Sequence, residues 1–159
     1  MLTIKLRPFG KSMPKNKKII GWTSVVGDLL HAGHHAMLKE CKQHCDFLYC
    51  GLIADPQLDR PEKNSPVQSL FERYMNLEGC KYVDQVIPLM GEDDLLLALK
   101  TFPIDIRFVG DDYRDRDFTG KDYCISTGIE IFYNKRDHGF SSTELRKRIV
   151  EAEDGKVQK

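Results

Sequence analysis

The feature that most constrains the fold is an alternation of short apolar runs with segments of helical periodicity. Apolar runs of strand length occupy residues 19–26, 47–54, 83–88, 106–110 and 129–133. Helical patterns occupy about residues 30–44, 68–79, 92–101 and 141–152. Strands that alternate with helices predict right-handed crossovers and a parallel sheet covered on both faces. We therefore expect one doubly wound, Rossmann-like α/β domain with a five-stranded parallel sheet.

The length and charge of the chain set further limits. Its 159 residues suffice for one domain of ordinary size but not for two well-formed cores. We expect a basic, disordered arm over residues 1–18, a domain over residues 19–153 and a tail over residues 154–159. Lys and Arg total 24, as do Asp and Glu, so no global field favours nucleic acid or acidic membranes. Any anion binding must come from local clustering.

Cysteine usage and hydropathy indicate the compartment. The five cysteines are odd in number and lack a C-x-x-C pair, which suits a reducing cytosol. Cys41, His44 and Cys45 could be ligands of a metal ion. Cysteines four apart on an amphipathic helix are more often core residues, so we predict no metal site in the protein. No apolar run approaches the ~20 residues of a membrane span, and residues 1–18 lack the apolar region of a signal peptide. We expect a soluble cytoplasmic protein with no membrane partner.

A histidine-rich segment follows the first predicted strand. If a helix begins near Leu29 or Leu30, His31 and His34 share one of its faces, and Gly33 leaves the backbone between them open. The N-terminus of that helix would offer unpaired N–H groups to an anion. The segment also lies beyond the carboxyl end of the first strand, where doubly wound sheets bind ligands. We interpret it as a phosphate site, with a surface histidine pair or adventitious metal binding as the alternative.

A second segment emerges at the same edge of the predicted sheet. Gly110-Asp111-Asp112-Tyr113 follows the fourth strand, and its small residue and two carboxylates would form a second wall of the ligand crevice. A Gly-Asp-Asp turn is also ordinary loop chemistry. The segment therefore indicates a ligand site only because it lies at this edge of the sheet.

A third segment, residues 135–144, follows the fifth strand and opens the last helix. Ser141 and Glu144 predict a capping box, which accounts for those two residues. Arg136, Ser142 and Thr143 are left unexplained by capping. One cation and two hydroxyls at a helix N-terminus could bind a polyphosphate.

The connection over residues 55–66 is rich in proline and charge and is long for a compact domain, which is typical of a lid. Its Lys63 or Arg60 could neutralise phosphate charge over the crevice, with Arg73 on the following helix in support. A lone loop lysine is more often only solvated.

Taken in order, these segments resemble the cytidylyltransferase-like nucleotidyltransferases, and most closely the branch of glycerol-3-phosphate, phosphocholine and phosphoethanolamine cytidylyltransferases. The resemblance covers about residues 19–150. It rests on residues 28–34, Glu72-Arg73, residues 81–86, residues 110–113, and Arg136 with residues 139–143. It implies that a phosphomonoester oxygen attacks the α-phosphate of CTP in line and that pyrophosphate leaves. Catalysis then consists mostly of positioning and charge stabilisation.

The resemblance also implies residue roles. The catalytic set would be His31, His34, Arg136 and Lys63, with the histidines on the α-phosphate and Lys63 as a mobile cation. The nucleotide-binding set would be Val26, Gly27, Asp28, Gly33, Gly110, Asp111, Asp112, Tyr113, Ser141, Ser142 and Thr143. The acceptor-binding set would be Arg73 and Lys81. Mg²⁺ would accompany the triphosphate, held by phosphates and water, and homodimers are usual among similar proteins.

One departure from the family keeps alternatives open. Similar proteins carry Gly-x-Phe-Asp where this chain has Val25-Val26-Gly27-Asp28, so either the turn shifts by a residue or two or nucleotide binding is weakened. The first alternative is an adenylyltransferase acting on a sugar or cofactor phosphate. The second is a non-catalytic nucleotide-binding domain.

Overall fold

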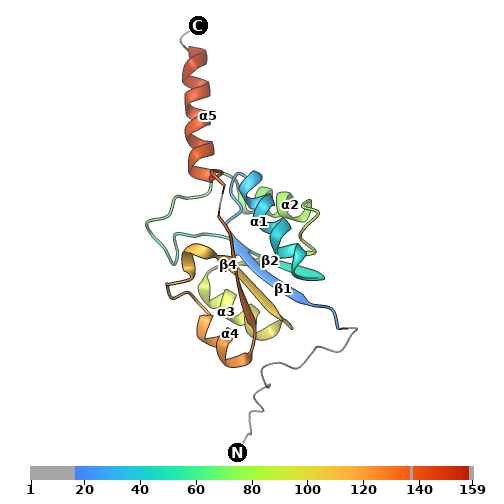
Figure 1. Cartoon of the computed structure of the whole chain (residues 1–159). Coiled ribbons are helices and arrows are strands. Elements are labelled where there is room, and N and C mark those ends of the chain that lie inside the picture. The colour runs from blue at the N-terminus through green and yellow to red at the C-terminus, as the bar shows by residue number, and fades with distance from the viewer. Residues whose placement is uncertain (1–16, 137, 158–159) are drawn as a thin grey trace, which may run out of the picture.

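A five-stranded parallel sheet forms the centre of the computed structural model, which describes residues 17–136 and 138–157 (Figure 1). The strands are β1 (Ile20–Val25), β2 (Phe47–Ile53), β3 (Gln85–Leu89), β4 (Ile106–Gly110) and β5 (Glu130–Asn134). They are arranged in the order β3-β2-β1-β4-β5, and every neighbouring pair is parallel. The strand order reverses at β1, which lies between β2 and β4. This confirms the predicted sheet and its switch point.

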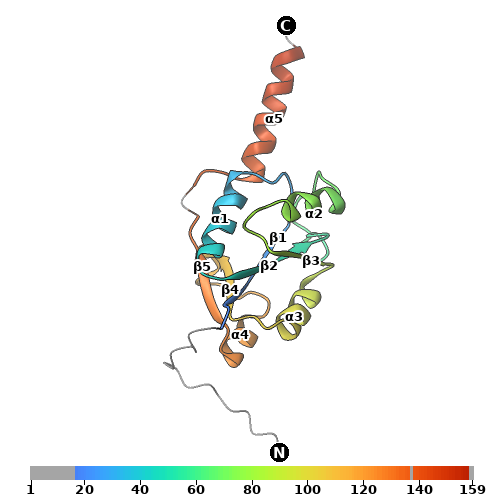
Figure 2. The same cartoon turned by 90° about the vertical axis from the view of Figure 1, so that its right-hand side faces the viewer.

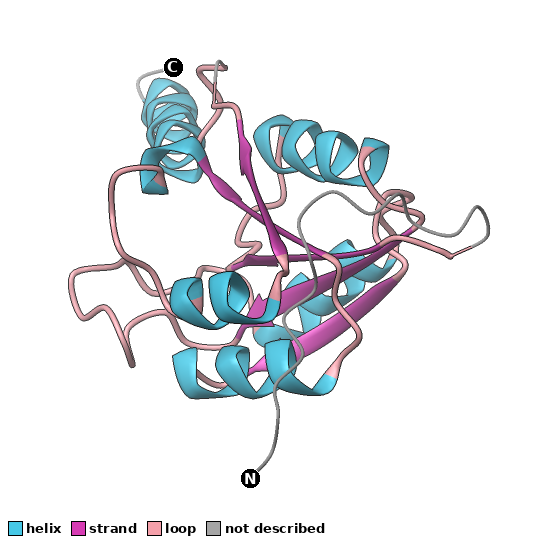
Figure 3. Cartoon of the chain, turned by 60° about the horizontal axis from the view of Figure 1, so that its bottom comes forward, coloured by secondary structure: helices cyan, strands magenta, loops and turns pink. Residues whose placement is uncertain are grey.

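Helices cover both faces of the sheet (Figures 2 and 3). They are α1 (Ala32–Gln43), α2 (Leu70–Glu78), α3 (Glu92–Thr101), α4 (Lys121–Thr127) and α5 (Ser142–Val157), with the short 3₁₀ helix η1 (Asp111–Tyr113) after β4. Helices α1 and α2 contribute to one apolar cluster, and α3 and α4 contribute to the other. The fold is thus a three-layer α/β domain.

The strands divide their side chains between these two clusters. Leu48, Cys50 and Leu52 of β2 pack in the cluster of α1 and α2, whereas Tyr49 packs against Trp22 in the cluster of α3 and α4. Alternate side chains of a strand point to opposite faces of a sheet, so a strand buried on both sides is apolar throughout. All five cysteines are free and buried, and burial raises the pKa of the Cys50 thiol to about 12.

Some element boundaries differ from the predicted ones. Helix α4 was not predicted, because its seven residues are too few to show a helical period and only Cys124 is buried. It begins after Gly120 and ends before Gly128, which both have left-handed backbones (φ 79° and 77°). Helix α5 continues to Val157, so residues 154–157, expected as a tail, are helical. Most of the predicted basic arm, residues 1–16, lies outside the described residues.

Helix α5 projects away from the rest of the domain (Figure 1). Its first turns contact the domain through Arg146, whereas Ile149 and Val150 farther along are exposed. Within residues 17–136 and 138–157, no helix is long and apolar enough to cross a bilayer.

Candidate functional site

The turn between β1 and α1 contains two residues with left-handed backbones. Gly27 has φ 68° and Leu29 has φ 49°. Glycine adopts this conformation without steric cost, whereas leucine is strained in it. The strained turn is held from outside, because the backbone N–H of Leu29 donates to Oε1 of Gln68 at 2.8 Å. Val25 remains in β1, so the glycine of this chain occupies a position that needs positive φ.

The paired histidines cap α1. The helix begins at Ala32 and not near residues 29–30 as expected, so His31 precedes it with an extended backbone (φ −132°, ψ 175°). Nδ1 of His31 accepts from the Gly33 N–H at 3.1 Å, and Nδ1 of His34 accepts from the His31 N–H at 3.4 Å. Their ring centroids are 4.1 Å apart. Because each Nδ1 accepts a hydrogen bond, each neutral ring carries its proton on Nε2.

Burial keeps these imidazoles uncharged. It lowers the pKa of His34 to about 4, and the neighbouring His31 and His35 lower it further. Burial also lowers the pKa of His31, as do the nearby His138, His35 and Arg148. At neutral pH the pair therefore offers Nε2–H donors and no positive charge.

A hydrogen-bond chain joins His31 to the start of α5. Nε2 of His31 lies 3.3 Å from Oγ of Ser142, and that hydroxyl donates to the Asp28 carbonyl at 3.3 Å. Ser142 thus accepts from His31 and donates to the turn. The start of α5 is itself capped by Ser141, whose Oγ accepts from the Glu144 N–H at 3.1 Å. The N-termini of α1 and α5 are therefore adjacent.

Asp28 ties this turn to two other segments. Its carboxylate is 4% exposed, accepts from the Gln68 N–H at 2.9 Å and pairs with Arg146 at 2.5 Å. Burial alone raises the pKa of Asp28, but the hydrogen bonds from the Gln68 and Val67 backbone and from Arg146 bring it below its usual value. Arg146 also donates to the Ser65 carbonyl at 3.2 Å. One carboxylate thus connects the turn, the long loop and α5.

The turn after β4 meets the loop after β5. Oδ1 of Asp112 lies 3.5 Å from Nε of Arg136. A Cβ on Gly110 would lie 3.0 Å from the same Nε, so the absence of a side chain leaves room for this approach. Asp111 and Asp112 are exposed, and Tyr113 is half-buried. The structure thus brings the predicted Gly-Asp-Asp-Tyr turn and Arg136 together at the edge that carries His31.

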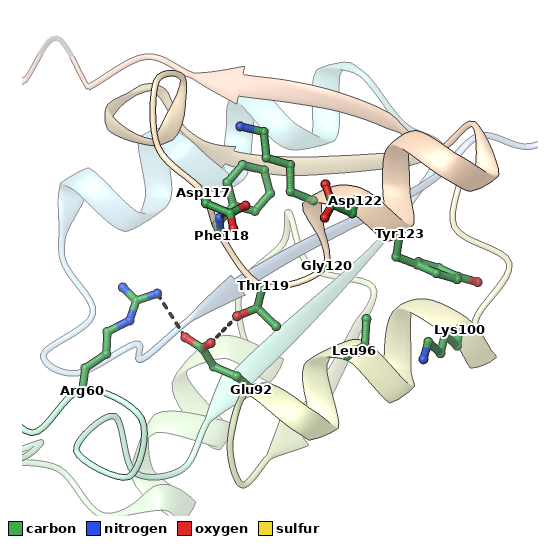
Figure 4. A pocket seen from close by; sticks show the side chains of 11 residues that line it. Arg60, Glu92, Leu96, Lys100, Asp117, Phe118, Thr119, Gly120, Asp122 and Tyr123 are labelled. Atoms are coloured by element: carbon green, nitrogen blue, oxygen red, sulfur yellow. Dashed lines mark hydrogen bonds and ion pairs between the residues drawn. The ribbon is translucent and has the colours of Figure 1, made fainter.

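Lys63 and Arg60 lie on the long loop after β2. Lys63 is exposed, and its ammonium forms no ion pair with the residues that the structure describes. Arg60 instead fastens the loop, because it donates to the Tyr113 hydroxyl at 2.6 Å and pairs with Glu92 at 3.2 Å. A pocket of about 550 Å³ begins beside Arg60 and runs between α3 and α4, with Thr119 and Lys100 among its lining residues (Figure 4).

The N-termini of α1 and α5, Arg136 and the turn after β4 form a cradle. The structure does not bring the two predicted acceptor residues into this cradle. Arg73 is 2% exposed, and its guanidinium donates to the carbonyls of Val26 (2.9 Å), Ile53 (2.7 Å) and Ala54 (2.6 Å), so it holds the ends of β1 and β2. Lys81 precedes β3, at the edge where the strands begin, opposite to that of His31. Its ammonium lies 5.1 Å from the Tyr82 ring centroid.

Three contributors to the site were missed from the sequence: Gln68, His138 and Arg146. Arg146 had a usable signal, since it stands four residues after Ser142 and so on the same face of α5. Gln68 and His138 had none, because loop paths bring them to the turn.

The part of the sequence that contains these site residues identifies the family of the chain. A family model described as cytidylyltransferase-like matches residues 28–148, from Asp28 at the turn into α5. The chain belongs to the cytidylyltransferase-like family. All the segments that form the cradle lie within the matched range.

Curated relatives of this cytidylyltransferase-like chain agree with the assignment. Glycerol-3-phosphate cytidylyltransferase from Bacillus subtilis is 30% identical over 134 residues, which cover 84% of this chain and 98% of that protein. A probable ethanolamine-phosphate cytidylyltransferase from Encephalitozoon cuniculi is 31% identical and covers 81% of this chain and 40% of that protein. The bifunctional protein HldE from Rhodospirillum rubrum is 32% identical over 82% of this chain. The chain spans about a quarter (26%) of the length of that relative.

A solved structure supports the fold. The lipopolysaccharide core biosynthesis protein from Thermoplasma volcanium superposes with a TM-score of 0.59 at 24% identity and covers 75% of this chain and 96% of that protein. At this identity the similarity concerns the fold alone.

Proposed function

We propose that this chain transfers CMP from CTP to a small phosphorylated alcohol and releases pyrophosphate. The observation that carries the proposal is the contact between His31 and Ser142, which sets the N-termini of α1 and α5 side by side at the switch point of the sheet. Two adjacent helix N-termini with hydroxyl and imidazole donors suit a chain of phosphates. The cytidylyltransferases among the relatives favour CTP as the nucleotide.

In this mechanism the α-phosphate lies over the paired imidazoles. Nε2–H of His34 donates to one of its non-bridging oxygens, and Nε2–H of His31 exchanges Ser142 for another, where negative charge increases in the transition state. An oxygen of the acceptor phosphomonoester attacks phosphorus, the bond to the bridging oxygen breaks, and pyrophosphate leaves with that electron pair. Neutral donors suit this step, because they need no proton transfer.

The leaving group would lie toward α5. Ser142 and Thr143 begin that helix, and Arg136 approaches from the preceding loop. A guanidinium donates strong, often bidentate, hydrogen bonds to phosphate. We assign the β- and γ-phosphates to these residues and the nucleoside to the turn from Gly110 to Tyr113. Lys63 remains the proposed mobile cation of the loop.

Mg²⁺ is proposed to enter with the triphosphate. The described residues contain no group of three or more His, Cys, Asp or Glu side chains placed to hold a metal ion. We propose that phosphate oxygens and water hold the ion. When bound, it would neutralise charge on the phosphate chain.

A substrate screen tests the proposal. Purified protein is mixed with MgCl₂, either CTP or ATP, and glycerol 3-phosphate, phosphocholine or phosphoethanolamine, and pyrophosphate release is measured. We expect release with CTP and at least one acceptor. Release of pyrophosphate with ATP but not with CTP would indicate that the chain is an adenylyltransferase. If nucleotide binds but no pair of nucleotide and acceptor releases pyrophosphate, the chain is a non-catalytic nucleotide-binding domain.

A further inference from the structure

A third imidazole reaches the histidine cradle from the loop between β5 and α5. A Cβ built on Gly33 would lie 2.8 Å from Cε1 of His138 and 3.0 Å from Cε1 of His31. The carbonyl oxygen of Phe140 would be 2.9 Å away. Two imidazole edges, from segments far apart in the sequence, thus converge above the same glycine. The ring of His138 covers the backbone surface that the absence of a side chain on Gly33 leaves open.

The His138 ring has an unused hydrogen-bonding group at this point. Its Nδ1 is buried and has no hydrogen-bond partner among the described residues. Both nitrogens of His31, in contrast, have partners, the Gly33 N–H and the Ser142 hydroxyl. Buried polar atoms without a partner are rare in folded proteins, since they lose their hydrogen bonds to water. Nδ1 is bonded to Cε1, the atom nearest to Gly33, and is therefore on the edge of the ring that meets the cradle.

Resting on the function proposed above, we infer that His138 is a third phosphate-binding side chain. When the nucleotide enters, a phosphate oxygen binds beside the ring at the edge that carries Nδ1, and Nδ1–H of His138 donates to it. His31 and His34 contact the α-phosphate, while the start of α5 receives the far end of the chain. A side chain that reaches over Gly33 from the segment leading into α5 lies between these two, so the geometry points to the β-phosphate. If the His138 ring were instead a plug that the nucleotide must displace, removing the ring would raise the affinity for nucleotide.

Calorimetric titration of the full chain with CTP, CDP and CMP in the presence of MgCl₂ tests this inference. The variants are His138→Ala, His138→Asn and His138→Gln, with His44→Ala as the matched control because His44 is an exposed histidine at the other end of α1. An asparagine amide can occupy the position of Nδ1, whereas a glutamine amide reaches that of Nε2. A hydrogen bond to a charged group typically changes affinity by about tenfold to a hundredfold.

We expect His138→Ala to weaken CTP and CDP binding about tenfold or more and CMP binding less than about twofold. His138→Asn should recover most of this loss and His138→Gln little of it, and His44→Ala should bind as wild type does. Unchanged CTP affinity in His138→Ala would overturn the inference, and tighter binding would identify the ring as a plug. If the alanine variant does not fold, as judged by circular dichroism, the asparagine and glutamine variants decide. Wild-type protein that binds no nucleotide would refute both this inference and the proposed function.

Discussion

Leu29 shows how single residues carry strain at the turn that presents the histidines. Its left-handed backbone disfavours any side chain, and β-branched ones most. We therefore expect Leu29→Val to be less stable than Leu29→Gly by about 1 kcal/mol, although valine keeps more apolar surface. Urea denaturation of the two variants measures the difference. A more stable valine variant would show that burial, and not backbone strain, controls this position.

His34 makes the stability of the protein depend on pH. Its pKa of about 4 lies below the ordinary value of 6.5, so the unfolded chain binds this proton more readily than the folded one. Its contribution to the free energy of unfolding is therefore complete above pH 6.5, falls as pH drops toward 4 and stays constant below. Since one pKa unit is worth ~1.4 kcal/mol and the ring is partly exposed, we expect a loss of about 1–3 kcal/mol.

Denaturation of wild type and His34→Asn at pH 7 and pH 4.5 isolates this effect, because the two proteins share all other titrating groups. Asparagine can still accept the His31 N–H through its side-chain oxygen. The stability advantage of wild type over the variant should shrink at the lower pH. An advantage of equal size at both pH values would contradict the assigned pKa.

One ion pair, between Arg146 and Asp28, helps the hydrogen bonds of Ser142 to hold the start of helix α5 against the cradle. Arg146→Met would leave the buried carboxylate of Asp28 without its cation and is expected to lower the free energy of unfolding by about 1–3 kcal/mol, less than for a fully buried pair because Arg146 is partly exposed. Lys147→Met is the matched control, since Lys147 is exposed and, among the residues that the structure describes, forms an ion pair only with Glu144, 3.6 Å away. Urea denaturation compares the two. Equal stabilities would mean that the ion pair does not secure α5.

Some elements could be predicted from the sequence and others could not. The buried strands were predictable because parallel strands covered on both sides are apolar runs, as in Phe47–Ile53. The four longer helices showed a period, whereas α4 is too short to do so. The capping role of His31 was not predictable in detail, because the first residue of α1 depends on a strained turn and on Gln68, which is distant in sequence.

In the molecule as a whole, the switch point of the sheet decides which predicted site residues meet. The carboxyl ends of β1 and β4, together with the loop after β5, bring His31, Gly110, Arg136 and Ser142 to one edge, as the strand pattern indicated. Lys81 was assigned from the family motif alone, and its place before β3 puts it at the opposite edge. Contacts made by Gln68 and His138 depend on loop paths that no local pattern records.

The most direct test of the account is the rate of pyrophosphate release by His34→Ala relative to wild type, with CTP, MgCl₂ and the best acceptor. Loss of one preorganised transition-state donor typically costs about 10²–10³ in rate, so we expect kcat/KM to fall by about that factor while circular dichroism shows an intact fold. His44→Ala serves as the control and should retain wild-type activity. A folded His34→Ala protein that releases pyrophosphate at the wild-type rate would contradict the claim that the paired imidazoles stabilise the transferring phosphate.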